Sequence, residues 1–206
     1  MTSTAQGVDE RSGNQRKHES RNPIQRALIE RFHREAIAMI GQAKPDTILE
    51  LGCGEGYVLE AFVQGGVKAE LSGVELSERA VRLARERLGA RATIEHRDAR
   101  ELVANGRHFD LVMMLEVLEH IPEPSQMLDI LDDLSSRWLL LSVPWEPFFR
   151  GLNFMRGKNL TRWGNDPEHV NHWSRRGFAR FIGERFEIVA MPQVFPWTMA
   201  LARKRG

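Results

Sequence analysis

The most informative segment of this chain reads Ile48-Leu49-Glu50-Leu51-Gly52-Cys53-Gly54-Glu55-Gly56. Its mainly apolar first half predicts a buried strand, its alternating glycines predict a turn, and a helical pattern follows at once. Glycine adopts positive φ and lets a ligand approach the backbone where a Cβ would collide. The spacing differs from the Gly-x-Gly-x-x-Gly of dinucleotide-binding loops, and the segment lacks the Lys-Ser/Thr of a P-loop. We therefore expect a ligand-binding turn of another kind at the end of this strand.

Short apolar runs alternate with helical periods along the rest of the chain. This alternation predicts a parallel sheet with helices on both faces. Only a short link separates the last two runs, so they should pair antiparallel. The expected strands span residues 47–51, 69–74, 92–95, 109–115, 138–143, 186–191 and 197–203. The expected helices span residues 23–40, 56–64, 77–88, 98–104, 124–134 and 174–184.

The composition is that of one ordinary globular domain. The chain has 206 residues, of which 42% are apolar and 28% are charged, enough to bury a substantial core. Its 29 Lys and Arg balance 28 Asp and Glu, and a net charge of +1 disfavours nucleic acid as a partner. The single cysteine excludes an intramolecular disulfide framework and a multi-cysteine zinc site, which favours a reducing compartment.

The distribution of apolar residues bears on location and on the N-terminal segment. No apolar run approaches the roughly 18–20 residues that a membrane span needs, and the N-terminus lacks the apolar core of a secretory signal. We therefore expect a cytoplasmic protein. Residues 1–20 carry too little apolar surface to offset the entropy of ordering, so they should form a mobile N-terminal tail. The alternative is a lid that orders over a ligand, and residues 16–23 fit either interpretation. Residues 21–206 should form a single domain.

Acidic residues follow the next two expected strands. Glu75 stands at the end of the strand that follows the glycine turn, where an acid can accept hydrogen bonds from both hydroxyls of a ribose. Asp98-Ala99 follows the third strand, where it could meet the amino group of an adenine. Parallel strands end at one edge of a sheet, so these residues and the glycines should line one crevice. The combination favours a nucleoside site over ordinary turn glycines and solvated carboxylates.

The motifs E-L-G-C-G-E-G, G-V-E-L-S, R-D-A and L-E-V-L-E-H together resemble the class I S-adenosylmethionine-dependent methyltransferases. The resemblance is close over residues 48–143 and covers the remainder in outline. It implies a Rossmann-like α/β fold with a seven-stranded, mostly parallel sheet, an antiparallel last strand and helices on both faces. It also implies S-adenosyl-L-methionine as the cofactor.

The resemblance implies a role for each matching residue. Gly52 and Gly54 would pack against the methionine and ribose parts of the cofactor, with Cys53 as a small filler between them and Glu50 supporting the loop. The other implied cofactor contacts are Glu75 to the ribose hydroxyls, Leu76 beside the adenine, Asp98 and Ala99 at the adenine edge, and the backbone of Leu115 near the methionine end.

The chemistry of methyl transfer sets the remaining requirements. The cofactor's methyl group is already electrophilic because it sits on a positively charged sulfur, so catalysis is mostly positioning. An oxygen or carbon acceptor must also lose a proton, which calls for a base or for a metal that lowers the acceptor's pKa. The candidates are Glu116, Glu119 and His120 after the fourth strand and His169 before Trp173. If a helix turn starts at residue 116, the first three share one face.

Three interpretations of this cluster stay open. His120 or His169 could be a general base, with Glu116 beside it, because histidine titrates near neutral pH. Alternatively, a divalent metal (Mg²⁺, Mn²⁺ or Zn²⁺) could be held by Glu116, Glu119, His120 and His169. This set of residues resembles that of the small-RNA 3′-terminal 2′-O-methyltransferases. Finally, E-V-L-E-H is frequent among methyltransferases of quinones and small metabolites, and its polar residues could simply line the cleft. The other histidines, His18, His33, His96 and His108, are expected on the surface.

Residues 144–173 lack a clear period and are rich in aromatic side chains. A connection of this length inside a compact domain is usually functional, so we expect a substrate cap with aromatic walls; a hydrophobic subdomain with its own small core is the alternative. Aromatic residues among cations at 145–158 fit transient contact with a membrane surface. The enzyme would then be cytoplasmic and peripheral to the membrane.

These observations predict methyl transfer to a hydroxyl, or less readily a carbon, of a small-molecule or lipid-linked acceptor. Ubiquinone-type methyltransferases resemble this chain through E-V-L-E-H. The alternatives are a metal-dependent RNA 3′-terminal 2′-O-methyltransferase and a catalytically inactive cofactor-binding module that serves in interactions. A nicotinamide-dependent oxidoreductase is disfavoured by the glycine spacing.

Overall fold

A computed structural model of the protein describes residues 12–145 and 170–205. Its strands are β1 (Thr47–Leu51), β2 (Glu70–Glu75), β3 (Thr93–His96), β4 (Phe109–Leu115), β5 (Ser135–Pro144), β6 (Phe186–Ala190), β7 (Gln193–Val194) and β8 (Trp197–Lys204). Its α-helices are α1 (Gly13–His18), α2 (Pro23–Ala43), α3 (Tyr57–Gln64), α4 (Glu78–Leu88), α5 (Ala99–Ala104), α6 (Pro124–Leu134) and α8 (Arg175–Ile182). Short 3-10 turns lie at Gly89–Arg91 and Leu118–His120.

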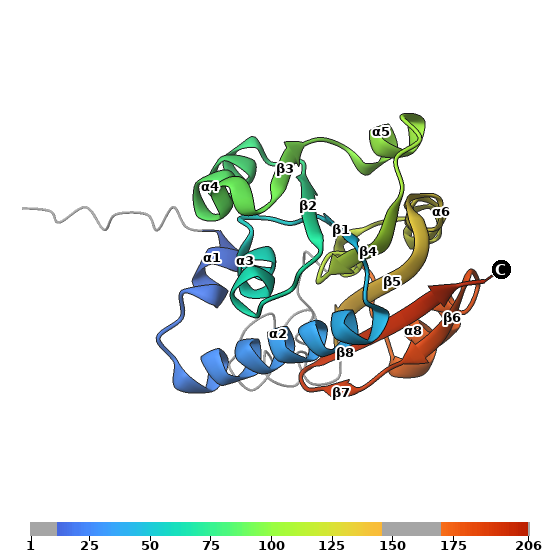
Figure 1. The fold of residues 1–206 in the computed structure, drawn as a ribbon. Coiled ribbons are helices and arrows are strands. Elements are labelled where there is room, and N and C mark those ends of the chain that lie inside the picture. The colour runs from blue at the N-terminus through green and yellow to red at the C-terminus, as the bar shows by residue number, and fades with distance from the viewer. Residues whose placement is uncertain (1–11, 146–169, 206) are drawn as a thin grey trace, which may run out of the picture.

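The strands form one sheet in the order β3-β2-β1-β4-β5-β8-β6, with the two-residue β7 paired to β8 (Figure 1). Strands β1 to β5 pair parallel, whereas β8 is antiparallel to both of its neighbours. The expected strands, including the antiparallel closing pair, are therefore confirmed. The chain winds outward from β1 to β3 and then crosses to β4 on the other side of β1, so the strand order reverses between β1 and β4. Open α/β sheets bind ligands outside the carboxyl ends of the strands at such a point.

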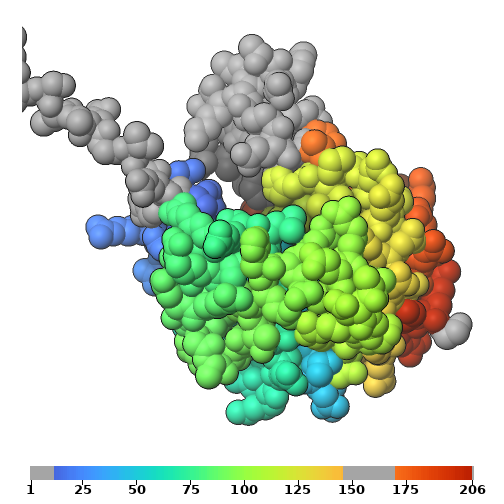
Figure 2. All heavy atoms as spheres, turned by 90° about the horizontal axis from the view of Figure 1, so that it is seen from above, coloured from blue at the N-terminus to red at the C-terminus, as the bar shows by residue number. Residues whose placement is uncertain are grey.

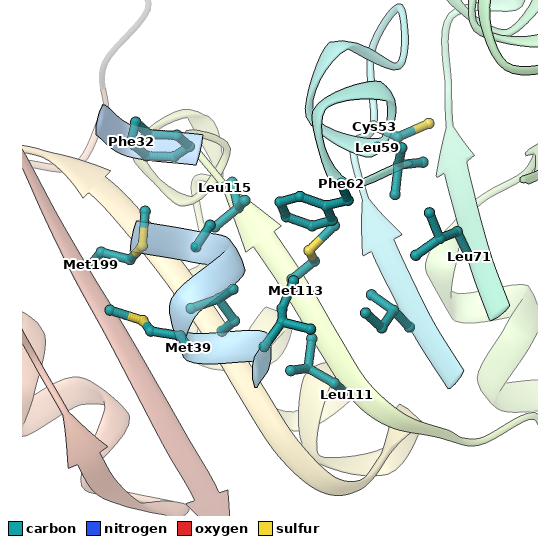
Figure 3. Packing of buried hydrophobic residues seen from close by; sticks show 14 of the residues in the cluster. Phe32, Met39, Cys53, Leu59, Phe62, Leu71, Leu111, Met113, Leu115 and Met199 are labelled. Carbon is teal, nitrogen blue, oxygen red and sulfur yellow. The ribbon is translucent and has the colours of Figure 1, made fainter. Parts of the chain in front are cut away.

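Helices cover both faces of the sheet because successive side chains of a strand point to opposite faces. Leu111, Met113 and Leu115 of β4 pack with α2, α3 and α4, whereas Val112 and Met114 pack with α5, α6 and α8. Figure 3 shows part of the first layer, where side chains from α2, α3, β4 and β8 meet. A central strand that is buried on both faces explains why β4 is almost continuously apolar.

The N-terminal segment differs from the sequence prediction. Residues 13–18 lie within the predicted mobile tail, but they form the helix α1. Ser12 caps this helix by accepting a hydrogen bond from the Gln15 amide, and the Gln15 side-chain oxygen accepts one from the Ser12 amide, which completes a capping box. Figure 2 shows the blue atoms of the N-terminal helices against the teal and green atoms of the region around α3 and α4.

The predicted substrate cap at residues 144–173 and the predicted membrane-contacting segment at 145–158 lie almost entirely outside the described residues. Within residues 12–145 and 170–205, none of the helices combines the length and the apolarity that a membrane crossing requires.

Candidate active site

The glycine turn after β1 has the strained backbone that its sequence predicts. Gly52, Gly54 and Gly56 have φ angles of +72°, +52° and +79°, a region that other residues rarely adopt. A Cβ on Gly52 would lie 2.9 Å from Cγ2 of Val117, and one on Gly54 would lie 3.1 Å from Nδ2 of Asn14. The backbone of the turn therefore packs directly against the side chains of Val117 and Asn14, with little room for a Cβ at Gly52 or Gly54.

Glu75, at the end of β2, is tied to this turn. One carboxylate oxygen accepts a hydrogen bond from the Gly54 amide at 3.0 Å, and the other accepts from the amides of Leu76 and Ser77 at 2.8 and 2.9 Å. These bonds hold the carboxylate beside the glycine turn, where the sequence predicted it. Leu76 is 68% exposed, so an apolar side chain stands open next to this carboxylate.

Asp98 begins α5 at the end of β3 and serves first as a helix cap. Its carboxylate accepts a hydrogen bond from the Arg100 amide at 2.9 Å and pairs with the Arg100 side chain. The guanidinium of Arg100 lowers the pKa of this carboxyl. Asp98 and Ala99 therefore stand at the expected strand end, with the Asp98 carboxylate already bonded to its own helix.

Glu50 and Cys53 lie behind the turn. Glu50 is 2% exposed, and burial together with the neighbouring Glu75 carboxylate raises the pKa of Glu50 to about 8. Cys53 is 5% exposed and packs against Gly73 of β2. Burial raises the pKa of its thiol, which fits a filler and not a nucleophile.

Helix α1 closes over the glycine turn through Glu55. Ser12 Oγ and Asn14 Nδ2 each donate to one carboxylate oxygen of Glu55, both at 2.6 Å. His18 stacks on Tyr57 with ring centroids 4.5 Å apart. The sequence predicts a tail or a lid here and gives no contact for Ser12, Asn14 or His18, although Ser12-x-x-Gln15 is a recognisable capping-box sequence.

The same stack corrects the prediction that His18 and His33 are surface residues. Their rings lie 5.6 Å apart and are nearly parallel. Burial is the main reason why the pKa values fall to about 3 for His18 and about 4 for His33, and Lys17 lowers both further. Both rings are therefore neutral at neutral pH.

The segment after β4 departs from the predicted helical face. Glu116 has a φ of +60°, and the 3-10 turn starts only at Leu118. Glu119 is 2% exposed, whereas the His120 side chain is 41% exposed, with its Nε2 3.9 Å from Oε1 of Glu119. The expectation that all three side chains share one helix face is therefore wrong, because the left-handed residue breaks the helical register.

Ser142 at the end of β5 fixes Glu116. The backbone amide of Glu116 donates to the Ser142 carbonyl at 3.2 Å and to its Oγ at 3.1 Å. The Ser142 hydroxyl in turn donates to Oε1 of Glu116 at 2.9 Å. These bonds hold the left-handed residue at the carboxyl edge of the sheet, between β4 and β5.

His169 lies outside the described residues, but the chain just after it returns to this place. The amides of Val170 and Asn171 donate to the Glu119 carbonyl at 2.9 and 3.1 Å. The Asn171 side chain donates to the carbonyls of Leu118 and Ile121. The structure thus brings the end of the 144–173 segment against the 3-10 turn that carries His120.

The predicted metal centre finds no support in the described residues. Among residues 12–145 and 170–205, no three His, Cys, Asp or Glu side chains are grouped as ligands of a metal ion. Glu116, Glu119 and His120 do not form such a group, and the fourth proposed ligand is His169. We therefore derive no step through a metal.

A comparison with protein families agrees with the resemblance seen in the sequence. A family model described as "Methyltransferase domain" matches residues 18–185, which is most of the chain. The chain belongs to the class I S-adenosylmethionine-dependent methyltransferases. The resemblance seen in the glycine turn and the strand-end acids is thereby confirmed.

Similar proteins agree with this family. The methyltransferase is 37% identical over 82 residues to the ubiquinone biosynthesis O-methyltransferase of Aromatoleum aromaticum, an alignment that covers 38% of this chain and 34% of the relative. The chain thus matches about a third of the length of the first curated relatives.

Solved structures share the fold. The magnesium protoporphyrin IX methyltransferase of Synechocystis PCC 6803, crystallised with bound SAH, has a TM-score of 0.69 at 21% identity and covers 89% of this chain and 88% of its own. The N-methyltransferase NodS of Bradyrhizobium japonicum WM9, in complex with S-adenosyl-L-homocysteine, has a TM-score of 0.66 at 16% identity and covers 91% and 90%.

The residues of the site fit the cofactor of this family. Gly52 and Gly54 present backbone without a Cβ, and Glu75 offers a fixed carboxylate one strand away. Leu76 provides the exposed apolar surface on which an adenine could rest. These four residues lie along the carboxyl ends of β1 and β2, and we refer to them as the nucleoside cradle after the ligand that they would fit.

Proposed function

We propose that the methyltransferase moves a methyl group from S-adenosylmethionine to a hydroxyl of a small or lipid-linked metabolite. The observation that carries the proposal is the fixed Glu75 carboxylate beside the glycine turn, because a carboxylate there is suited to two adjacent sugar hydroxyls. The similarity to enzymes named ubiquinone biosynthesis O-methyltransferase supports oxygen as the accepting atom.

Different residues of the chain would bind different parts of the cofactor. When bound, the cofactor would supply an electrophilic methyl group on a positively charged sulfur. Glu75 and Leu76 would hold its nucleoside, and the bare backbone of Gly52 and Gly54 would let it lie close to β1. The Leu115 backbone, at the end of the neighbouring β4, would face its methionine end. Most of the rate would come from this positioning.

His120 is our proposed general base. Its imidazole is partly exposed at the carboxyl edge, and its Nε2 lies 3.9 Å from Oε1 of Glu119, which would orient the ring toward the acceptor. Glu116 would orient the acceptor from the end of β4, and His169 remains a second proton-handling candidate. A lipid-linked acceptor would be met at a membrane surface through residues 145–158, and a small acceptor in the cytoplasm.

Transfer of a tritiated methyl group tests the proposal. The protein is incubated with labelled S-adenosylmethionine and a cell extract that has been divided into water-soluble and lipid fractions, and the labelled product is identified by mass spectrometry. A product labelled on oxygen supports the proposal, and the fraction that contains it decides between a small and a lipid-linked acceptor. Label found only on nitrogen or on RNA would contradict it.

His120→Ala tests the proposed base. We expect S-adenosylhomocysteine to bind with unchanged affinity, because His120 lies beyond the nucleoside cradle. Turnover should fall by about 10²–10⁴-fold, the usual contribution of a positioned acid or base. His108→Ala is the matched control, since His108 is exposed in the loop before β4, at the opposite edge of the sheet. Normal turnover in His120→Ala would remove this residue from the mechanism.

A further inference from the structure

A cavity lies at the carboxyl edge of the sheet, on the far side of the glycine turn from Glu75. Its floor is formed by Leu115 and Glu116 at the end of β4. Asn14, which stands over Gly54, and Val58, in the first turn of α3, connect this cavity to the glycine turn. The cavity therefore begins where the nucleoside cradle ends, at the reversal of strand order between β1 and β4.

The walls of the cavity are apolar and aromatic. Ile29 and Phe32 of α2 line one side, and Trp197 at the start of β8 lines another. The rings of Phe32 and Trp197 meet edge to face, with centroids 5.0 Å apart. Figure 3 shows Phe32 and Leu115 on the same face of the sheet. Walls of this kind suit a flat, apolar molecule.

One cation projects into this apolar space. Lys17 of α1 lines the cavity, and its Nζ lies 5.1 Å from the ring centroid of Trp197. Within the described residues, this ammonium has a cation–π contact and no ion pair. Its neighbour in the lining, His18, is neutral at neutral pH because burial lowers its pKa to about 3. Lys17 is therefore the cationic side chain among the described residues that line the cavity.

The position of Lys17 is set by contacts of its helix on both sides. Ser12 and Asn14 hold the start of α1 to Glu55, and His18 stacks on Tyr57 at its end. On the floor of the cavity, Glu116 is held by Ser142 of β5. The cavity thus has a fixed positive side on α1 and a fixed carboxylate at the end of β4.

From this arrangement we infer that the cavity is the acceptor site and that Lys17 selects acceptors which carry an ionised oxygen, a carboxylate or a phenolate, on a flat apolar body. The inference rests on the proposed function, because it assumes that the nucleoside cradle holds the methyl donor. The apolar walls take the body of the acceptor, and Lys17 binds its anionic oxygen, where a charged hydrogen bond is worth more than a neutral one. Lys17 is then a specificity-determining residue on a helix outside the sheet.

Binding of paired probes tests the inference. The full chain, saturated with S-adenosylhomocysteine, is titrated by calorimetry with 2-naphthoate and with 2-naphthamide, which differ in charge and hardly in shape. We expect the anion to bind about tenfold more tightly or better, the usual advantage of a charged hydrogen bond. Lys17→Met and Lys17→Gln should abolish this preference, and Lys17→Arg should retain most of it. Lys68→Met is the matched control, since Lys68 is exposed before β2, at the opposite edge of the sheet.

A second probe separates a phenolate from a carboxylate. The pKa of bound 4-nitrophenol is read from its visible absorbance, and a nearby ammonium should lower it by about one unit. That reduction should vanish in Lys17→Met and persist in Lys17→Arg, which a purely structural role of Lys17 would not produce. The probe whose affinity falls more in Lys17→Met identifies the oxygen that the site prefers.

The outcomes separate this inference from the proposed function. Failure of the wild-type protein to bind S-adenosylhomocysteine would refute the proposed function. If S-adenosylhomocysteine binds but neither anionic probe binds, the inference about Lys17 is overturned. The same conclusion follows if the preference for the anion survives in both Lys17→Met and Lys17→Gln.

Discussion

Glu75 is the residue on which we propose that cofactor binding most depends. Its two carboxylate oxygens already accept three backbone amides, so its orientation is fixed before a ligand arrives. Glu75→Gln replaces an acceptor oxygen by a donor NH₂, which opposes one of those amides and one sugar hydroxyl. We expect the dissociation constant of S-adenosylhomocysteine to rise about tenfold or more by calorimetry. Glu78→Gln, an exposed substitution in the first turn of α4, should leave it unchanged, and equal affinities in the two variants would contradict the ribose role.

The buried Glu50 should make the free energy of unfolding depend on pH. Its folded pKa of about 8 exceeds the ordinary value of 4.5, so the folded protein keeps a proton that the unfolded chain has lost. The free energy of unfolding should therefore decrease as the pH rises from 4.5 to 8, by at most about 1.4 kcal/mol per pH unit. Glu50→Gln cannot ionise, so urea unfolding across this window should show a flatter dependence than in the wild type. Parallel profiles for the two proteins would show that Glu50 ionises normally.

The position of Glu75 could be predicted from the sequence because it follows from its place at the end of a strand. The conformation of Glu116 could not, because the prediction assumed a helical turn and the residue instead adopts a φ of +60°. Its conformation depends on Ser142, which lies in another strand, β5, and is 26 residues away in the chain. Contacts of that kind leave no local signal in a sequence.

At the scale of elements, α2 and β4 were predictable and α1 was not. Both predictable elements bury a long run of apolar side chains, so their periods are visible in the sequence. Helix α1 has six residues, of which Gln15 is buried, and it depends on a capping box and on contacts with Glu55 and Tyr57. A short polar segment of this kind looks like a tail unless the surface that receives it is known.

Docking of α1 should be lost in acid. The pKa values of His18 and His33 are lowered from 6.5 to about 3 and about 4, so below 6.5 the unfolded chain binds protons that the folded stack excludes. The stability of the stack is full above 6.5 and is lost as the pH falls toward 4. We expect amide hydrogens of α1 to exchange faster in that window while those of β4 stay protected. His33→Gln should weaken this dependence and His108→Gln should not; loss of protection in β4 at the same pH as in α1 would argue against local undocking.

At the scale of the whole molecule, the arrangement of helices on both faces of the sheet follows from the sequence. Alternate residues of each strand point to opposite faces and pack into two separate hydrophobic clusters. The proposed acceptor cavity does not follow from the sequence, because α1, α2, α3, β4 and β8 each contribute between one and three lining residues. The two N-terminal helices, β4 and β8 are far apart in the chain, and the order of the strands brings them together. The fold and the strand-end positions of Gly52, Gly54 and Glu75 could therefore be predicted from sequence patterns, whereas the cavity required the tertiary structure.

The cofactor should stabilise the whole fold and not only its own loop. The nucleoside cradle joins β1 to β2, and β1 lies next to β4 at the middle of the sheet, so a ligand held there opposes global unfolding. A ligand at a hundred times its dissociation constant adds about 2.7 kcal/mol to the free energy of unfolding. For a chain of this size that corresponds to a rise in Tm of about 5–10 °C.

Differential scanning fluorimetry with S-adenosylhomocysteine and with NAD measures this effect. S-adenosylhomocysteine should raise Tm in the wild type and less in Glu75→Gln, because the weaker complex is less saturated. NAD should leave Tm unchanged, because the spacing Gly52-x-Gly54-x-Gly56 does not match a dinucleotide-binding turn. A larger rise with NAD than with S-adenosylhomocysteine would mean that the cradle was built for a different nucleoside, since stabilisation at equal concentration ranks the ligands by affinity.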